Sequence, residues 1–239
     1  MRKKKLSVSV FFPCYNDAGS IGLLVEDAYT ALKKITDDFE IIVVDDGSQD
    51  ESRKVLKKLQ GKIRELKLVF HDKNLGYGGA LKSGFRTATR DLVFYTDGDG
   101  QYDVRDISKL FDNLTQDADI VQGYKIKRHD PWYRLIIGRV YHYFSKILFG
   151  LKVRDVDCDF RLIRKKCIDS INLGHNSGVI CVELVKKLQD KGYKFVEVGI
   201  NHYPRLSGHS QFFNYKRVIK TLMELVGLWF NLVILRKNR

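Results

Sequence analysis

The stretch that decides the fold lies near the middle of the chain and reads Leu92-Val93-Phe94-Tyr95-Thr96-Asp97-Gly98-Asp99-Gly100-Gln101. Five β-prone residues followed by two carboxylates are typical of a buried parallel strand that ends in a polar loop. Side chains two apart on an extended segment point the same way, so Asp97 and Asp99 are expected to face one ligand together. A hard divalent metal, completed by phosphate oxygens, would offset their like charges. The alternative is an acidic turn in which glycine supplies the bend.

Apolar runs with polar ends recur earlier in the chain, separated by segments with helical spacing. The predicted order is strand 6–12, helix 21–35 with Ser20 as its cap, strand 39–44, helix 50–65, strand 66–70 and a helix from Ala80 to about Arg90. This β-α-β-α-β-α-β order predicts an α/β fold, a doubly wound and mostly parallel sheet with helices on both faces. Ligands of such sheets bind beyond the carboxyl ends of the strands.

Three polar loops are expected at that edge, namely Pro13–Asp17, Asp45–Ser48 and Asp97–Gln101, and together they predict a nucleotide-type site. The glycine-rich segment Asn74–Ala80 is either a phosphate loop or a helix entry with no phosphate near it. A Gly-x-Gly-x-x-Gly fingerprint after the first strand is absent, which argues against a dinucleotide cofactor.

The second half continues with further helices and strands. They are predicted as helix 104–116, strand 119–122, helix 132–151, a short strand after Asp159, helix 178–191, strand 194–203 and helix 212–235. Helix 132–151 mixes aromatic and basic residues, which suits a membrane interface or equally a helix packed on the core. The apolar part of the last helix, residues 222–235, would span only about 21 Å, short of the roughly 30 Å hydrocarbon core. It is expected to lie on a bilayer, with the protein core or a homodimer interface as the alternatives.

The net charge of +13 is unevenly distributed along the 239 residues. Residues 1–120 hold 19 Lys+Arg against 20 Asp+Glu, whereas residues 121–239 hold 23 against 9. A one-sided basic surface predicts an anionic partner, either acidic lipid or nucleic acid. The apolar run behind the basic N-terminus stops at Pro13, so we expect no signal peptide, no full transmembrane helix and a place on the cytosolic side. The four cysteines lack a C-x-x-C pair and are expected to be reduced, mostly buried thiols.

Six motifs in their order along the chain resemble the family 2 glycosyltransferases of GT-A fold, and among these the dolichyl- or polyprenyl-phosphate sugar synthases. The motifs are Pro13-Cys14-Tyr15-Asn16-Asp17, Val44-Asp45-Asp46-Gly47-Ser48, Asn74–Ala80, Asp97–Gln101, Asp155–Arg161 and Arg205-Leu206-Ser207-Gly208-His209-Ser210. The resemblance implies a metal-dependent, inverting hexosyltransferase that moves a sugar from a UDP- or GDP-linked donor to a polyprenyl phosphate at a membrane, without nucleic acid as a partner. It also implies a glycosyltransferase domain over residues 1–211, with a donor half 1–123 and an acceptor half 124–211, followed by an interfacial helix 212–239.

The resemblance assigns roles to individual residues. The donor would be held by Pro13, Tyr15, Asp17, Asp46, Gly76 and Asp97. Mg²⁺ or Mn²⁺ would be held by Asp97, Asp99 and Gln101, and acceptor phosphate by Lys125, Arg205 and Ser210. Asp97, Asp99 and Arg205 would be the catalytic residues. The chain departs from the family pattern at Asp17, Lys125, Asp159 and Gln211, where Glu, Arg, Gly and Lys are usual.

The chemistry favours a phosphate acceptor. A phosphate monoester, whose second pKa is about 6, is already an anion near neutral pH and needs positioning by cations more than a base. A sugar hydroxyl acceptor, the first alternative, would need a general base, for which Asp157 and Asp159 are the candidates. A non-enzymatic basic module that binds nucleic acid or membrane is the second alternative, but it leaves the carboxylates at the strand ends unexplained.

Overall fold

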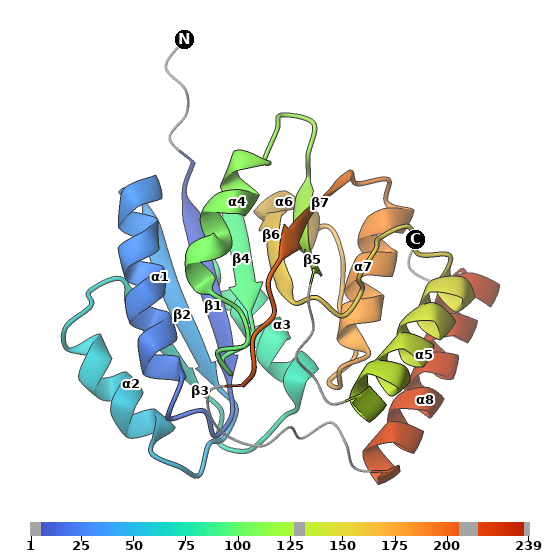
Figure 1. Ribbon diagram of the computed structural model, residues 1–239, viewed down its shortest axis with the longest axis horizontal. Helices are drawn as coiled ribbons and strands as arrows, with labels where there is room; N and C mark the ends of the chain where they lie inside the picture. The colour runs from blue at the N-terminus through green and yellow to red at the C-terminus, as the bar shows by residue number, and fades with distance from the viewer. Residues whose placement is uncertain (1–5, 127–131, 206–214, 237–239) are drawn as a thin grey trace.

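Seven strands form one sheet in the order β3-β2-β1-β4-β6-β5-β7 (Figure 1). The computed structural model describes residues 6–126, 132–205 and 215–236. The strands are β1 Val8–Cys14, β2 Phe39–Asp45, β3 Leu66–Phe70, β4 Leu92–Thr96, β5 Ile120–Lys125, β6 Phe160–Arg164 and β7 Phe195–Ile200. All pairings are parallel except those of β6, which runs antiparallel to both β4 and β5. The predicted mostly parallel α/β sheet is therefore confirmed.

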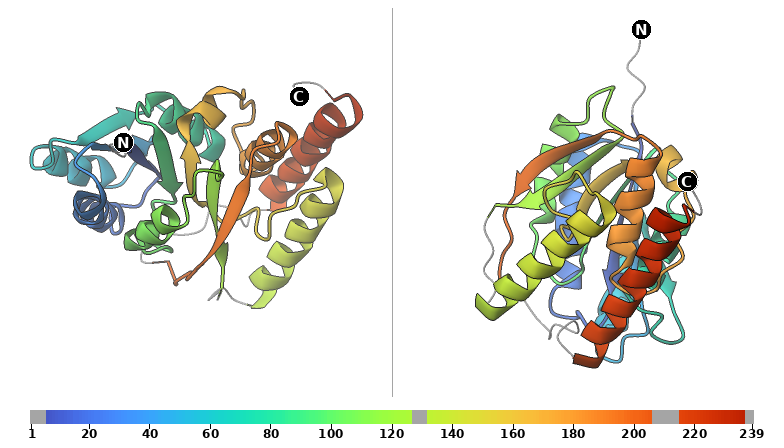
Figure 2. Two further views of the ribbon diagram at one scale, coloured as in Figure 1. Left: turned by 90° about the horizontal axis from the view of Figure 1, so that it is seen from above. Right: turned by 90° about the vertical axis from the view of Figure 1, so that its right-hand side faces the viewer.

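Helices cover both faces of this sheet (Figure 2). They are α1 Ile21–Ile35, α2 Ser52–Gln60, α3 Tyr77–Thr87, α4 Ile107–Asp112 after the 3₁₀ turn Val104–Asp106, α5 Trp132–Phe149, α6 Lys165–Asp169, α7 Ile180–Asp190 and α8 Tyr215–Trp229, which runs on as the π-helical turn Phe230–Ile234. Seen from above, α1 and α4 lie on one face, and α3 and α6 lie on the other. This layering is why β1, β2 and β4 are buried along their whole length and lack polar alternation.

Each face of the sheet has its own apolar core. On the side of α1, Val10, Phe12 and Phe94 pack with residues of α1 and α4. On the side of α3, Phe11 stacks on Tyr95 with ring centroids 5.4 Å apart, and both rings meet Phe85 edge to face. The four cysteines, Cys14, Cys158, Cys167 and Cys181, are buried thiols, as predicted.

Helices α5 and α8 form an outer layer beyond α7, at the end of the molecule away from β3 (Figures 1 and 2). Phe149 of α5 and Leu225 and Leu228 of α8 share a third apolar cluster with Val182 and Val185 of α7. Within the described residues, no helix is both long and apolar enough to cross a membrane.

Several local predictions need correction. Pro13 and Cys14 belong to β1, because its hydrogen-bonded register with β2 runs on to Cys14 and Asp45. Ser20 stands at the start of α1, yet its hydroxyl makes no cap and instead donates to the carbonyl of Gly98 at 2.8 Å. Strand β4 ends at Thr96, and a turn follows it. The two-residue strand period therefore does not apply to Asp97 and Asp99, and what brings them together is the turn.

The order in which strands are added to the sheet reverses between β1 and β4, although the two strands are parallel. From β1 it moves outward through β2 to β3, then returns on the other side of β1 as β4. The carboxyl ends of β1 and β4 lie side by side at this point, where open α/β sheets bind their ligands. Because β6 is antiparallel, the loop that precedes it reaches the same edge as the carboxyl ends of β4 and β5.

Candidate functional site

The three polar loops predicted to converge do so at the carboxyl ends of β1, β2 and β4. The backbone N–H of Asp46 donates to the carbonyl of Cys14 at 2.9 Å, and that of Asn16 donates to the Ser48 hydroxyl at 3.0 Å. A Cβ added at Gly98 would lie 2.4 Å from the Pro13 carbonyl oxygen, so only glycine lets these two loops approach so closely. These contacts join the three loops at one edge of the sheet.

Asp46 shapes the turn that leads into α3. Its Oδ1 accepts hydrogen bonds from the N–H of Leu75 at 2.8 Å and from Nδ1 of His71 at 2.7 Å, and its Oδ2 accepts from the N–H of Gly76 at 2.9 Å. Gly76 has a φ of +87°, a conformation that favours glycine. The Asp46 carboxylate is buried and engaged through both oxygens, so within the described residues its clearest role is to fix this turn.

The glycine-rich segment owes its glycines to close packing. The N–H of Gly78 donates to the Asn176 carbonyl at 2.8 Å, and a Cβ there would lie 2.4 Å from the carbonyl oxygen of His175. A Cβ at Gly76 would lie 2.5 Å from the Asn176 oxygen. Of the two interpretations of this segment, the helix entry accounts for these contacts without any phosphate.

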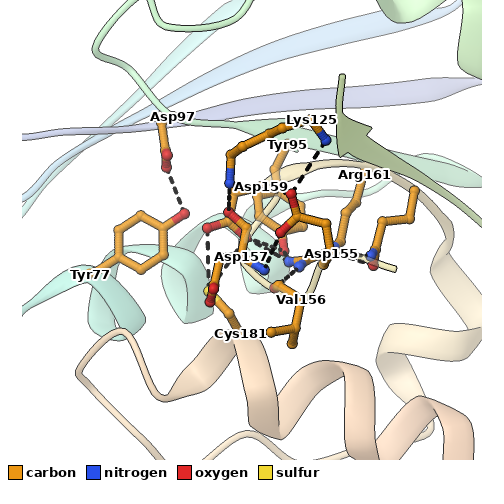
Figure 3. Close-up of polar contacts among 11 residues, drawn as sticks. Tyr77, Tyr95, Asp97, Lys125, Asp155, Val156, Asp157, Asp159, Arg161 and Cys181 are labelled. Carbon is orange, nitrogen blue, oxygen red and sulfur yellow. Dashed lines mark hydrogen bonds and ion pairs between the residues drawn. The ribbon is translucent and has the colours of Figure 1, made fainter. Parts of the chain in front are cut away.

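Asp97 is held from α3. The hydroxyl of Tyr77, the first residue of that helix, donates to Asp97 Oδ1 at 2.6 Å (Figure 3). Burial and the nearby carboxylates Asp159 and Asp99 raise the pKa of Asp97 well above its ordinary value, against the opposing effect of Tyr77. Tyr77 is a site residue that the sequence did not reveal, although it lies inside a motif that was singled out for its glycines.

Asp99 and Asp17 share one arginine. Nη2 of Arg205 lies 2.7 Å from Asp99 Oδ2, and Nη1 lies 3.6 Å from Asp17 Oδ1. Asp99 Oδ1 accepts the N–H of Gln101 at 3.0 Å. Burial raises the pKa of Asp17 to about 6; Asp99 adds to the rise, whereas the N–H of Tyr15 and the charge of Arg205 oppose it. These contacts bring the predicted metal, donor and acceptor residues Asp99, Asp17 and Arg205 into one cluster.

Lys125 is enclosed by the loop before β6 (Figure 3). Its Nζ donates to the Asp157 carbonyl at 2.6 Å and lies 3.7 Å from Asp155 Oδ2, and its N–H donates to that same oxygen at 3.3 Å. Asp155 Oδ1 accepts the N–H of Asp157 at 3.1 Å. His142 of α5 joins the two aspartates, with ligand atoms of the three residues within 4.8 Å of one another. The ammonium of Lys125 offsets only part of the charge of the two aspartates, so His142, Asp155 and Asp157 form a second group that could hold a metal ion.

Arg161 lies buried behind the site in β6. Its Nη1 donates to Asp159 Oδ1 at 2.6 Å and also to the Tyr95 hydroxyl, and its Nε donates to Gln122 at 2.9 Å. A buried guanidinium requires such a partner, since a lone buried charge is costly. The carboxylate of Asp159 is committed to this ion pair, which leaves it poorly suited to act as the general base of a hydroxyl acceptor.

The oxygen ligands at the turn after β4 suit a divalent cation. Asp97 and Asp99 supply carboxylate oxygens, and a bound cation would offset both the burial and the neighbouring carboxylates that raise the pKa of Asp97. Gln101 donates through Nε2 to the Tyr203 carbonyl at 3.2 Å, so its amide oxygen is the atom suited to a metal. Pro13 is buried and Tyr15 half-buried beside this turn, and Ser210 lies outside the described residues.

The outer layer presents apolar side chains to solvent. On α8 and the turn after it, the exposed residues recur at helical spacing: Ile219, Leu222, Met223, Val226, Phe230 and Ile234. The opposite stripe, Thr221, Leu225, Leu228 and Leu232, is buried. On α5, Val140, Tyr143, Phe144 and Ile147 are exposed, Ile147 at 81%. We call the exposed apolar residues of these two helices the outer apolar face. A helix that is apolar on both sides is usually covered on both.

Comparison with known proteins places this arrangement in a family context. Residues 9–171 match the sequence family described as Glycosyl transferase family 2. The chain is 29% identical over 227 residues to an undecaprenyl-phosphate 4-deoxy-4-formamido-L-arabinose transferase of Sodalis glossinidius, covering 95% of this chain and 66% of that protein. It is 27% identical over 228 residues to the protein of the same name from Aeromonas hydrophila, with the same coverage. The chain thus spans about two thirds of the length of these curated relatives.

Solved structures show the same fold. A glucosyl-3-phosphoglycerate synthase from Mycobacterium tuberculosis, in complex with Mn²⁺, UDP and phosphoglyceric acid, superposes with a TM-score of 0.71 at 15% identity, covering 94% of this chain and 78% of that one. The same enzyme with Mg²⁺ and UDP gives a TM-score of 0.68 at 15% identity, covering 93% and 80%. The predicted GT-A fold is confirmed.

Proposed function

The chain belongs to glycosyl transferase family 2, and we propose that it transfers a sugar from a nucleotide sugar to a polyprenyl phosphate, with inversion, at the cytosolic face of a membrane. The observation that carries the proposal is the meeting of Asp97, Asp99 and Arg205 at the carboxyl edge of the sheet. Carboxylates suited to a metal and an arginine suited to a phosphate lie together there. The undecaprenyl-phosphate transferases among the relatives support this choice of acceptor.

The donor would bind across the ends of β1 and β2. Pro13, Tyr15 and Asp17 would line one side of this region, and Asp46 would support the other by fixing Gly76. The position agrees with the general placement of nucleotides at the point where strand order reverses. Asp46 would then contribute mainly by shaping the loop. Asp17 would offer a carboxylate to the hydroxyl groups or the nucleobase of the nucleotide sugar.

Mg²⁺ or Mn²⁺ would be held by Asp97, Asp99 and Gln101. When bound, it would stabilise the negative charge that develops on the leaving nucleoside diphosphate. Tyr77 orients Asp97 through its hydrogen bond, and the N–H of Gln101 orients Asp99. The Mn²⁺ and Mg²⁺ complexes of the Mycobacterium tuberculosis enzyme, which shares the fold, are consistent with this assignment.

Arg205, Lys125 and Ser210 would position the acceptor phosphate. Arg205 can offer two parallel N–H donors to a phosphate, whereas Lys125 offers a point charge. The contacts of Lys125 with Asp155 and Asp157 make it a more distant, electrostatic contributor. The acceptor monoester attacks as an anion, so the site needs no separate general base.

The outer apolar face would rest on the membrane that holds the lipid. Arg139 of α5, Lys220 of α8 and Arg236 just after the π-helical turn are exposed, which suits anionic headgroups. In Figure 1 the first turns of α5 and α8 lie toward the edge of the sheet where the strands end, at the bottom of the view. A lipid phosphate at the membrane surface would thus approach the site from the side of these helices.

A donor panel tests the proposal. The full chain is given labelled UDP- and GDP-sugars, Mn²⁺ and vesicles that contain polyprenyl phosphate, and label in the organic phase is counted. We expect transfer from one donor, loss of transfer in Asp99→Asn, and no loss in Asp112→Asn, which removes an exposed carboxylate elsewhere. Hydrolysis of every donor without lipid labelling would refute the proposal.

A further inference from the structure

We propose that Arg205 acts as a stand-in cation for the divalent metal at Asp99, and that metal binding releases it to bind the acceptor phosphate. The inference rests on the proposed function and adds to it a role for one residue, Arg205, in coupling the metal site to the acceptor site. The supporting observation is the position of the Arg205 guanidinium between Asp17 and Asp99.

The guanidinium bridges two carboxylates that come from different loops. It contacts Asp99 Oδ2 at 2.7 Å and lies 3.6 Å from Asp17 Oδ1, an oxygen that is buried and accepts no hydrogen bond from the described residues. The Asp17 and Asp99 side chains are 9% and 7% exposed, whereas Arg205 is 29% exposed. The Arg205 guanidinium, which is the more exposed group, thus offsets the charge of two buried carboxylates.

Arg205 and a metal would compete for the same oxygen. A divalent cation such as Mg²⁺ ligated by Asp99 needs a carboxylate oxygen at about 2.0 to 2.1 Å, and the guanidinium 2.7 Å from Asp99 Oδ2 obstructs that approach by volume and by charge. The other oxygen, Oδ1, already accepts the N–H of Gln101. The contact with Oδ2 is therefore the one that binding of the metal must weaken.

The released arginine is then available for the acceptor. Nη2 of Arg205 faces Asp99 and Nη1 faces Asp17, so the arginine cannot keep both contacts and also present this pair of nitrogens to a phosphate. The metal would thus raise the affinity for phosphate, and by linkage phosphate would raise the affinity for the metal by the same factor. Such coupling would keep the acceptor site weak until the donor side is filled.

The first test measures Mn²⁺ binding to the full chain without substrates, from the paramagnetic resonance signal of free Mn²⁺. We expect Arg205→Gln to bind Mn²⁺ about tenfold more tightly than the wild type, within the usual range of coupling. The matched control is Arg105→Gln, because Arg105 is an exposed arginine whose partner is Asp103 rather than a site carboxylate. It should change the affinity less than about twofold. Unchanged or weaker Mn²⁺ binding by Arg205→Gln would overturn the inference.

The second test measures inorganic phosphate binding by calorimetry, with free Mg²⁺ either absent or held at saturation. In the wild type we expect Mg²⁺ to tighten phosphate binding, and in Arg205→Gln we expect no such gain. An equal gain in both proteins would contradict the inference. If Arg205→Gln melts abnormally, Arg205→Lys replaces it; a point charge without the fork should show a smaller gain than the wild type, and an undiminished gain would again contradict it.

Neither test uses a nucleotide sugar or a lipid. Linkage without sugar transfer would therefore refute the proposed function alone, and sugar transfer without linkage would refute only the role of Arg205 as a stand-in cation.

Discussion

The Tyr77 hydroxyl donates a hydrogen bond of 2.6 Å to Asp97 Oδ1, and this bond joins the first turn of α3 to the turn after β4. One residue before Tyr77, the N–H of Gly76 is held by Asp46. The proposed donor and metal sides of the site are thus connected through two adjacent residues, so a change in either is expected to reach the other.

Loss of this hydroxyl should weaken the metal site without unfolding the protein. In Tyr77→Phe we expect Mn²⁺ affinity and turnover to fall about tenfold, since one hydrogen bond to a charged group contributes about 1.5 kcal/mol. Tyr193→Phe is the matched control, because its hydroxyl bonds Ser170 far along the chain from these motifs. Equal Mn²⁺ affinities in wild type and Tyr77→Phe would show that the bond does not orient Asp97.

Removal of the Asp46 carboxylate should loosen the turn that precedes α3. In Asp46→Ala the N–H groups of Leu75 and Gly76 lose their acceptor, so we expect nucleotide affinity to fall at least tenfold and the free energy of unfolding to fall by about 1 to 3 kcal/mol. Titration of UDP and GDP, followed by calorimetry, measures the first effect. If both nucleotides bind as tightly as to the wild type, the turn is not part of the donor site.

Stability is expected to fall in acid because of Glu40. Burial alone would raise its pKa, but hydrogen bonds from Lys67, Ser9 and Thr89 outweigh burial and lower the pKa to about 2. A carboxylate with a lowered folded-state pKa stabilises the protein above its ordinary value of 4.5, and this contribution disappears as the pH falls toward 2. The contribution is about 3 kcal/mol at neutral pH.

Urea unfolding at pH 7 and at pH 3.5, chosen as a point about midway in this window, tests the effect of Glu40. Glu40→Gln should destabilise the protein at pH 7 and show a smaller loss between the two pH values than the wild type. The control is Glu51→Gln, which breaks an exposed pair with Lys54 and should leave the pH dependence unchanged. A Glu40→Gln variant with the full pH dependence would assign the acid sensitivity to other carboxylates.

The outer apolar face should be needed for membrane binding and not for folding. Met223→Glu and Val226→Glu replace exposed residues of α8, so we expect binding to anionic vesicles to fall about tenfold while the melting temperature is nearly unchanged. Leu23→Glu on α1 is the control, because Leu23 is 59% exposed but lies outside this face. Sedimentation with vesicles measures binding. If all three variants lose vesicle binding equally, the added negative charge rather than the loss of the outer apolar face explains the effect.

Much of the fold follows from local patterns. Strand β3 was predicted at Leu66–Phe70 and is found there, because apolar runs between turn residues define strands directly. The short helix α6 was missed since five residues carry too little periodicity. The prediction of a mostly parallel sheet did not identify β6 as the antiparallel strand, because a strand's direction depends on its neighbours in space.

The site, like the fold, was predictable where it follows from strand order and not where it depends on contacts between distant segments. Convergence of the three loops follows from strand order, and it is confirmed. The contact of Tyr77 with Asp97 and the approach of His142 to Asp155 and Asp157 join segments distant in sequence, which no local pattern encodes. Asp97 and Asp99 were placed on an extended segment because the strand was assumed to continue, whereas it ends at Thr96.

The most direct measurement of the central claim compares two acceptors that differ by one phosphate. The full chain receives its preferred labelled nucleotide sugar and Mn²⁺, with vesicles that carry either polyprenyl phosphate or the corresponding polyprenol. The account predicts label in the lipid fraction with the phosphate and none with the alcohol. Equal labelling of the alcohol, or transfer only to a soluble sugar hydroxyl, would contradict it.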